Sequence, residues 1–251
     1  MVESDWSKWP HMNGDSTFEQ IILSQEEECR RATIAAFGLI SKEVQTAKLL
    51  FDQLLQHLYR FSSCHWGCHG GEHVFEYIAG RAVTSLICAI RLADSGYYDE
   101  SLGLVRGAGE SANLLNLFLA DTQHVRKWID SPENTRKTEY GPSKVRKMLN
   151  QMDALVPYKD AHYSSLCRFV HPNPTTTPQS HNASGLPSLG AVFQQNGYVR
   201  CTWEAAWALC AVSGPMSKLA VFPEDQAMRM VNMTVELSTL AFEHSPYIES
   251  Q

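Results

Sequence analysis

Two stretches of the chain would place arginine, carboxylate and histidine side chains together on helical faces. On a helix spanning 98–120, Arg106, Glu110 and Asn113 fall in one narrow stripe, because residues three and four apart share a face. A helix spanning 157–171 carries a second polar set on one side, which consists of Asp160, Ser164, Cys167, Arg168 and His171. In such a network a histidine can transfer protons near neutral pH, and an arginine can hold a phosphate through two hydrogen bonds.

Leucine and aromatic residues border both polar stripes. This pattern favours an interface between the two helices, so we expect the stripes to converge within hydrogen-bonding reach and to be largely shielded from water. A buried Arg106 would need a carboxylate partner, and Glu110 lies one turn away. The alternative is that these two residues form an exposed pair on a solvated face.

The segment 61–73 is rich in glycine, cysteine and histidine. Its candidate metal ligands are Cys64, His65, Cys68, His69 and His73. Zinc prefers thiolate and imidazole ligands, but a structural zinc site usually takes its second pair from a distant part of the chain, and no such pair follows. The Cys-x3-Cys-His spacing also differs from the Cys-x2-Cys-His of haem attachment. We expect an exposed helix connection without a structural metal or cofactor, and keep zinc binding at 64–73 as an alternative.

A cluster of basic residues follows further along the chain. Its members are Arg126, Lys127, Arg136, Lys137, Lys144, Arg146 and Lys147, a third of all the lysines and arginines. A phosphate backbone could bind there, with Trp128 and Tyr140 available to stack on bases. The alternative is an ordinary solvated surface.

Helical periodicity dominates the elements that must position these residues. The predicted helices span 16–60 with a break near Gly38, 72–94, 98–120, 123–129, 142–153, 157–171, 202–214 and 224–244. Ser16 and Glu19 have the spacing of a capping box, and the tight turn at Ser95-Gly96 predicts that 72–94 and 98–120 pack antiparallel. A polar leader (1–15), a long loop (172–188) and a hairpin signal at Asn196-Gly197 complete the chain. The sequence thus predicts one all-α bundle of about six to eight helices over 16–251, with a short β-hairpin near 190–201.

Composition limits the classes of function. The 251 residues carry 21 Lys and Arg against 27 Asp and Glu, a net charge of -6, which excludes an overall basic surface but not a local basic patch. No apolar run reaches the roughly 20 residues that a membrane span needs, and the acidic N-terminus does not resemble a signal peptide. Seven scattered cysteines fit reduced thiols better than a disulfide framework. We therefore expect a cytoplasmic protein with no membrane partner.

The pattern Arg106-x3-Glu110, followed by Tyr163-x2-Leu166-x4-His171, is similar to an uncharacterised group of bacterial all-helical proteins. That group resembles the HEPN superfamily, helical bundles that include metal-independent ribonucleases of defence and toxin–antitoxin systems. The likeness covers about residues 75–172 and implies a bundle that forms homodimers. The HEPN motif is Arg-x4–6-His, whereas this chain has Arg168-x2-His171; Arg60-x4-His65 has the right spacing but lies at a helix end.

Two classes of function remain open. The first is a HEPN-like helical protein without a catalytic motif, which binds RNA or a partner protein; the loop 172–201 with Trp203 and Trp207 would then be the partner surface. The second is a metal-independent endoribonuclease, in which His171 acts as general base on a 2′-hydroxyl and Arg168 stabilises the phosphorane. Arg106, Glu110 and Asn113 would orient that pair.

Overall fold

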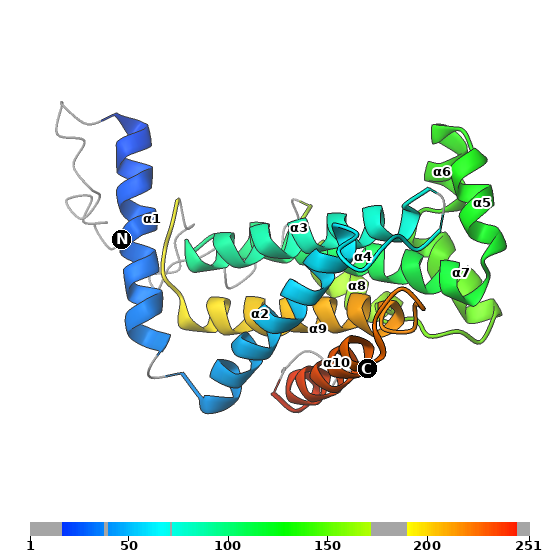
Figure 1. Cartoon of the computed structure of the whole chain (residues 1–251). Helices are drawn as coiled ribbons and strands as arrows, with labels where there is room; N and C mark the ends of the chain where they lie inside the picture. The colour runs from blue at the N-terminus through cyan, green and yellow to red at the C-terminus, as the bar shows by residue number, and fades with distance from the viewer. Residues whose placement is uncertain (1–16, 38–39, 71, 172–189, 245–251) are drawn as a thin grey trace.

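The computed structural model describes residues 17–37, 40–70, 72–171 and 190–244, and these residues form ten helices and no strand (Figure 1). The helices are α1 (Phe18–Phe37), α2 (Lys42–Ser62), α3 (Val74–Asp94), α4 (Tyr98–Ala120), α5 (Gln123–Asp130), α6 (Glu133–Glu139), α7 (Pro142–Gln151), α8 (Asp160–Cys167), α9 (Gln195–Met216) and α10 (Glu224–His244). The all-α class is confirmed, with more helices than the six to eight expected. Within these residues, no helix is both long and apolar enough to cross a membrane.

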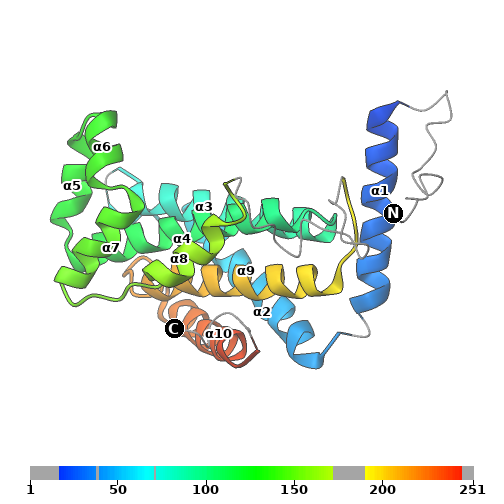
Figure 2. The same ribbon diagram turned by 180° about the vertical axis from the view of Figure 1, so that it is seen from behind.

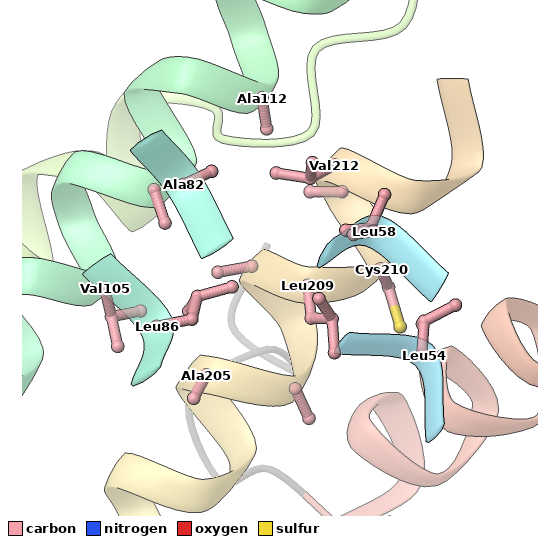
Figure 3. Close-up of a cluster of buried hydrophobic side chains, with 14 of the residues drawn as sticks. Leu54, Leu58, Ala82, Leu86, Val105, Ala112, Ala205, Leu209, Cys210 and Val212 are labelled. Atoms are coloured by element: carbon pink, nitrogen blue, oxygen red, sulfur yellow. The ribbon is translucent and has the colours of Figure 1, made fainter. Parts of the chain in front are cut away.

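Helix α9 is the centre of the bundle. It packs against α4, α10, α3 and α2, and almost its whole length is buried. Its repeated alanines let these neighbours approach closely, and a helix that is apolar all round belongs in a core. Figure 3 shows this contact, where Ala205, Leu209 and Val212 of α9 meet Leu54 of α2 and Leu86 of α3. Trp203 is 1% exposed, so the expectation that it forms part of a partner surface is wrong.

Helices α3 and α4 lie side by side and form the most extensive helix pair (Figure 1). Gly96 between them has φ +87, a left-handed conformation that glycine adopts without a steric penalty. A Cβ on Gly96 would also lie 2.7 Å from the Cys29 Sγ of α1. The predicted turn and the packing of these two helices are confirmed, and the same turn is where α1 contacts the bundle.

The two ends of the molecule differ. Figures 1 and 2 show α1 standing across one end of the bundle, while α5, α6 and α7 gather at the other. The capping box of α1 is one residue later than predicted. The Thr17 N–H donates to Gln20 Oε1 at 2.8 Å, and the Gln20 N–H donates to the Thr17 hydroxyl at 3.3 Å. The predicted leader 1–15, the break at Gly38 and the loop 172–188 lie outside the described residues.

The predicted hairpin at Asn196-Gly197 is wrong, because both residues belong to the first turn of α9. Gly197 serves close packing there, since a Cβ on it would lie 2.7 Å from the ring of Tyr98. The Tyr98 hydroxyl accepts a hydrogen bond from the Gln194 N–H at 2.9 Å, which fixes the chain just before the helix. Thr202, at which the sequence predicts this helix to begin, lies inside it and donates to the Tyr198 carbonyl at 3.0 Å.

The segment before α8 is tied to α4 by one asparagine and one glycine. The Asn113 side-chain amide donates to the Tyr158 carbonyl at 3.0 Å, and its oxygen accepts from the Tyr158 N–H at 3.1 Å. The Tyr158 ring then lies on Gly109, where a Cβ would be 2.7 Å away from it. Since both Asn113 and Tyr158 are buried, this contact leaves no space for a larger residue at 109.

We predict that Gly109→Ala destabilises the protein by about 1–3 kcal/mol, because the added methyl group overlaps a buried ring that cannot move. Gly107→Ala on the same helix is the matched control. No atom lies within 4 Å of a Cβ at 107, so alanine should stabilise the helix by about 0.5–1 kcal/mol. Urea unfolding of both variants measures the difference. Equal stabilities would contradict the tight contact between Gly109 and Tyr158.

Candidate functional site

Helix α8 runs back along α4, and the polar residues of α4 meet it there. Arg106 Nη2 lies 3.4 Å from Glu110 Oε1, and Arg106 Nη1 donates to the Cys167 thiol at 3.6 Å. The Tyr163 hydroxyl donates to Glu110 Oε1 at 3.0 Å, while its ring lies 5.3 Å from the Arg106 guanidinium. Burial and the Glu110 charge raise the pKa of Tyr163 to about 12, so the phenol remains a donor at neutral pH. We call these four residues the α4–α8 seam.

The seam brings together one member of each predicted stripe, Arg106 of α4 and Cys167 of α8. Its two charged side chains are partly shielded, with exposures of 18% for Arg106 and 29% for Glu110, so they do not form an open surface pair. Arg168 and His171 are exposed, however, and the expectation that they are shielded is wrong. The physical reason is that α8 ends at Cys167, four residues before the predicted end, so these two residues leave the helical face that meets α4.

Asn113 also plays a different part from the one expected. It shares a helical stripe with Arg106 and Glu110, but it lies deeper, at 2% exposure, where both of its polar groups bind the Tyr158 backbone. Its position is thus explained by packing. It fixes the chain from which α8, and with it Tyr163, departs toward the α4–α8 seam.

The seven basic residues do not form one surface. Arg146 is 5% exposed, donates to Asp160 Oδ1 at 2.6 Å and lies 4.2 Å from the centre of the Tyr163 ring. Arg126 is paired with Asp130 and Glu72, and Lys137 with Glu133. The charges of these three cations are therefore balanced. Lys127, Lys144 and Lys147 are exposed, while Arg136 lies over the Trp128 ring at 5.5 Å.

A cavity of about 530 Å³ lies between α3, α4 and the α5–α7 end of the bundle. Gly103, Gly107 and Ser111 of α4 line it with small side chains, and Glu110 of the seam faces it as well. Larger residues complete the lining. They are Tyr77 and Arg81 of α3, and Trp128, Arg136 and Tyr140 of the α5–α7 segment. We call this cavity the α3–α4 groove.

The groove combines positive charge with aromatic surface. Among the described residues, no carboxylate lies within ion-pairing distance of Arg81 or Arg136, and Tyr77 is 60% exposed. Arginines without a carboxylate partner are available to bind an anion, and the exposed Tyr77 ring is available for stacking, whereas the Trp128 and Tyr140 rings are half-buried. Sequence reasoning missed Tyr77 and Arg81. The signal was their i, i+4 spacing on the polar face of α3, opposite its apolar stripe.

A second polar cluster is buried between α8 and α9. His162 Nε2 and Glu204 Oε2 lie 2.6 Å apart, and their side chains are 1% and 0% exposed. The His162 ring stacks on Tyr158 at 4.5 Å, and burial raises the pKa of Tyr158 well above its usual value. Sequence reasoning missed this pair too. Glu204 is the single acid inside the apolar α9, and His162 lies between Tyr158 and Leu166 on the apolar side of α8.

Three of the five candidate metal ligands in the segment 61–73 come together. The ligand atoms of Cys64, Cys68 and His73 all lie within 4.8 Å of one another. His65 and His69 instead pack edge-on against Trp66 and Phe75. All seven cysteines are free, and Cys29, Cys201 and Cys210 are buried.

The fold is therefore an all-helical bundle in which the polar seam and the groove with its arginines and aromatic rings lie on adjacent faces of α4 and share Glu110. The chain matches no protein-family model, no curated protein and no solved structure.

We predict that Glu204→Ala destabilises the protein by about 3–5 kcal/mol, because it leaves His162 buried without its partner. Glu133→Ala is the matched control, since Glu133 and Lys137 form an equally short pair at 2.6 Å but are 70% and 68% exposed. An exposed pair contributes little to stability, so the control should unfold like the parent protein in urea. The assignment of the His162–Glu204 pair as a core contact is wrong if both variants behave alike.

Proposed function

We propose that the protein is a non-catalytic, HEPN-like helical protein that binds single-stranded RNA in the α3–α4 groove. One observation carries this proposal. Two arginines without a carboxylate partner, Arg81 and Arg136, line the same cavity as Tyr77, Trp128 and Tyr140. Single-stranded nucleic acids are bound by such a combination, in which cations contact phosphates and bases stack on aromatic rings.

The surroundings of the groove support an anionic ligand. Lys127, Lys144 and Lys147 are exposed on α5 and α7, and those helices belong to the end of the bundle that closes the groove. They give this end a local positive charge although the chain as a whole is acidic. The size of the cavity, about 530 Å³, suits one or two nucleotides.

The α4–α8 seam supports binding without catalysis. Arg106 and Glu110 are engaged with each other, and Tyr163 holds Glu110 from the other side. These contacts engage Arg106 Nη1 and Nη2 and Glu110 Oε1, so we assign the two residues the positioning of α8 on α4. Arg168 and His171 are two residues closer together than the HEPN motif requires.

We predict that Arg81→Ala/Arg136→Ala weakens the binding of a fluorescein-labelled single-stranded RNA by about tenfold or more, because two phosphate contacts are lost. The slope of log K against log salt should become shallower by about 1.4, roughly 0.7 for each contact. Fluorescence anisotropy at several salt concentrations measures both quantities.

The matched control is Arg126→Ala/Lys137→Ala, which removes the same charge from cations that are paired with carboxylates and do not line the groove. It should leave the affinity and the salt slope nearly unchanged. Tyr77→Ala should weaken binding through lost stacking. The proposal fails if the parent protein does not bind the RNA, or if the control pair weakens binding as much as the groove pair.

A ribonuclease is the second candidate, and one contact favours it. A Cβ on Gly103, which lines the groove, would lie 3.4 Å from the Val170 side chain. The exposed Arg168 lies two residues before Val170 and the exposed His171 directly after it, so both belong to a segment that reaches the groove. An RNA held there would pass near a histidine, the usual general base in metal-independent cleavage.

The non-catalytic proposal predicts that total RNA stays intact during a long incubation with the purified protein, with or without EDTA. Gel electrophoresis of the RNA is the measurement. EDTA-resistant cleavage that yields 2′,3′-cyclic phosphate ends and disappears in His171→Ala would establish the second candidate instead. Cleavage that survives in His171→Ala, and that a mock purification lacking this protein does not show, would also contradict the non-catalytic proposal.

A further inference from the structure

We propose that Cys64, Cys68 and His73 form a zinc site that joins the end of α2 to the start of α3. The ligand atoms of the three residues lie within 4.8 Å of one another. Cys64 Sγ lies 3.5 Å from His73 Nδ1. In a tetrahedral zinc site, with Zn–S near 2.3 Å and Zn–N near 2.0–2.1 Å, neighbouring ligand atoms are about 3.5–3.8 Å apart. The pair thus already has the spacing of one edge of such a site.

The connection between α2 and α3 holds these ligands in unusual backbone conformations. Cys64 and His73 have φ +55 and +51, and Asp153 is the only other described non-glycine residue with a positive φ. Backbone hydrogen bonds maintain the turn, from the Cys64 N–H to the Phe61 carbonyl at 2.9 Å and from the Gly67 N–H to the Cys64 carbonyl at 3.0 Å. Left-handed conformations at residues other than glycine persist where surrounding structure imposes them, and they concentrate at functional sites.

A buried carboxylate supplies negative charge next to the cluster. Glu76, in the first turn of α3, is 3% exposed, and one of its oxygens accepts a hydrogen bond from the His69 N–H. Its other oxygen is buried without a hydrogen-bond partner among the described residues. A buried carboxylate is costly unless a cation or donor compensates it. Glu76 is near enough to Cys64 for the two to interact electrostatically, so a metal ion held by Cys64, Cys68 and His73 would lie near this carboxylate.

The types of ligand select the metal. Two thiolates and one imidazole favour zinc over magnesium or calcium, which take oxygen ligands. No distant second pair of ligands follows in the chain, but His73 of the same segment supplies the third ligand beside Cys64 and Cys68. Cys68 and His73 are exposed and Cys64 is half-buried, so the fourth position of the tetrahedron faces solvent and would hold a water molecule. Three protein ligands and one exchangeable position are the arrangement of zinc sites that accept a further ligand.

The test is the metal content of the full chain, expressed with zinc and freed of loosely bound metal by gel filtration. Inductively coupled plasma mass spectrometry should find about one zinc ion per chain. Cobalt(II) added to the metal-free protein should give the near-ultraviolet charge-transfer absorption of cobalt–thiolate bonds. Cys64→Ser, Cys68→Ser and His73→Ala should each weaken zinc binding more than about tenfold in competition with a chromophoric chelator.

Two matched controls separate the site from general thiol or histidine binding. Cys88→Ser removes an exposed cysteine of α3, and His65→Ala removes an exposed histidine of the same segment that is not in the cluster. Both should retain one zinc ion, and circular dichroism should show equal helix content in all the variants. The proposal is overturned if the parent chain binds no zinc, if it carries a different metal, if Cys64 and Cys68 are recovered as a disulfide, or if the controls lose zinc with the ligand variants.

Discussion

The two hydrogen bonds between the Asn113 side chain and the Tyr158 backbone determine how the second half of the chain meets the first. They join α4 to the residues just before α8, and both Asn113 and Tyr158 are buried away from water. From this point α8 runs back along α4, so that Tyr163 reaches Glu110 and Cys167 reaches Arg106. Gly109 makes the contact possible by leaving space for the Tyr158 ring. Because the buried Asn113 side chain binds both the N–H and the C=O of Tyr158, neither backbone group is buried without a hydrogen-bond partner.

The central helix adds a second constraint. Helix α9 is buried along almost its whole length, yet it carries Glu204, which can be accommodated only because His162 of α8 lies 2.6 Å away. Helix α8 is thus held on one side by α4 and on another by α9. One face of α4 is used in this contact, and the adjacent face, with Gly103, Gly107 and Ser111, is left to form the groove. Because α8 covers one face of α4, the residues of the adjacent face, Gly103, Gly107 and Ser111, remain accessible in the groove.

Local patterns in the sequence predicted much of the fold. The sequence predicts a helix over 98–120, which is the range of α4, because Gly96 ends the preceding helix and the apolar residues recur with a regular helical period. The failures have nonlocal causes. Gly197 signals a turn by its type, but its actual role is to pack on Tyr98, a residue far away in the chain. The end of α8 at Cys167 and the burial of Glu204 likewise depend on contacts with other helices. The groove could not be predicted, since α3 contributes Arg81 and the α5–α7 segment contributes Arg136.

The most direct test of the account is to find where RNA touches the protein. A single-stranded RNA that contains 4-thiouridine can be crosslinked to the full chain by ultraviolet light, and the modified peptides can be identified by mass spectrometry. We expect crosslinks on the aromatic residues of the α3–α4 groove, Tyr77, Trp128 and Tyr140, and we expect them to disappear at high salt. Crosslinks confined to other parts of the chain, or none under conditions where a known RNA-binding protein is labelled, would contradict it.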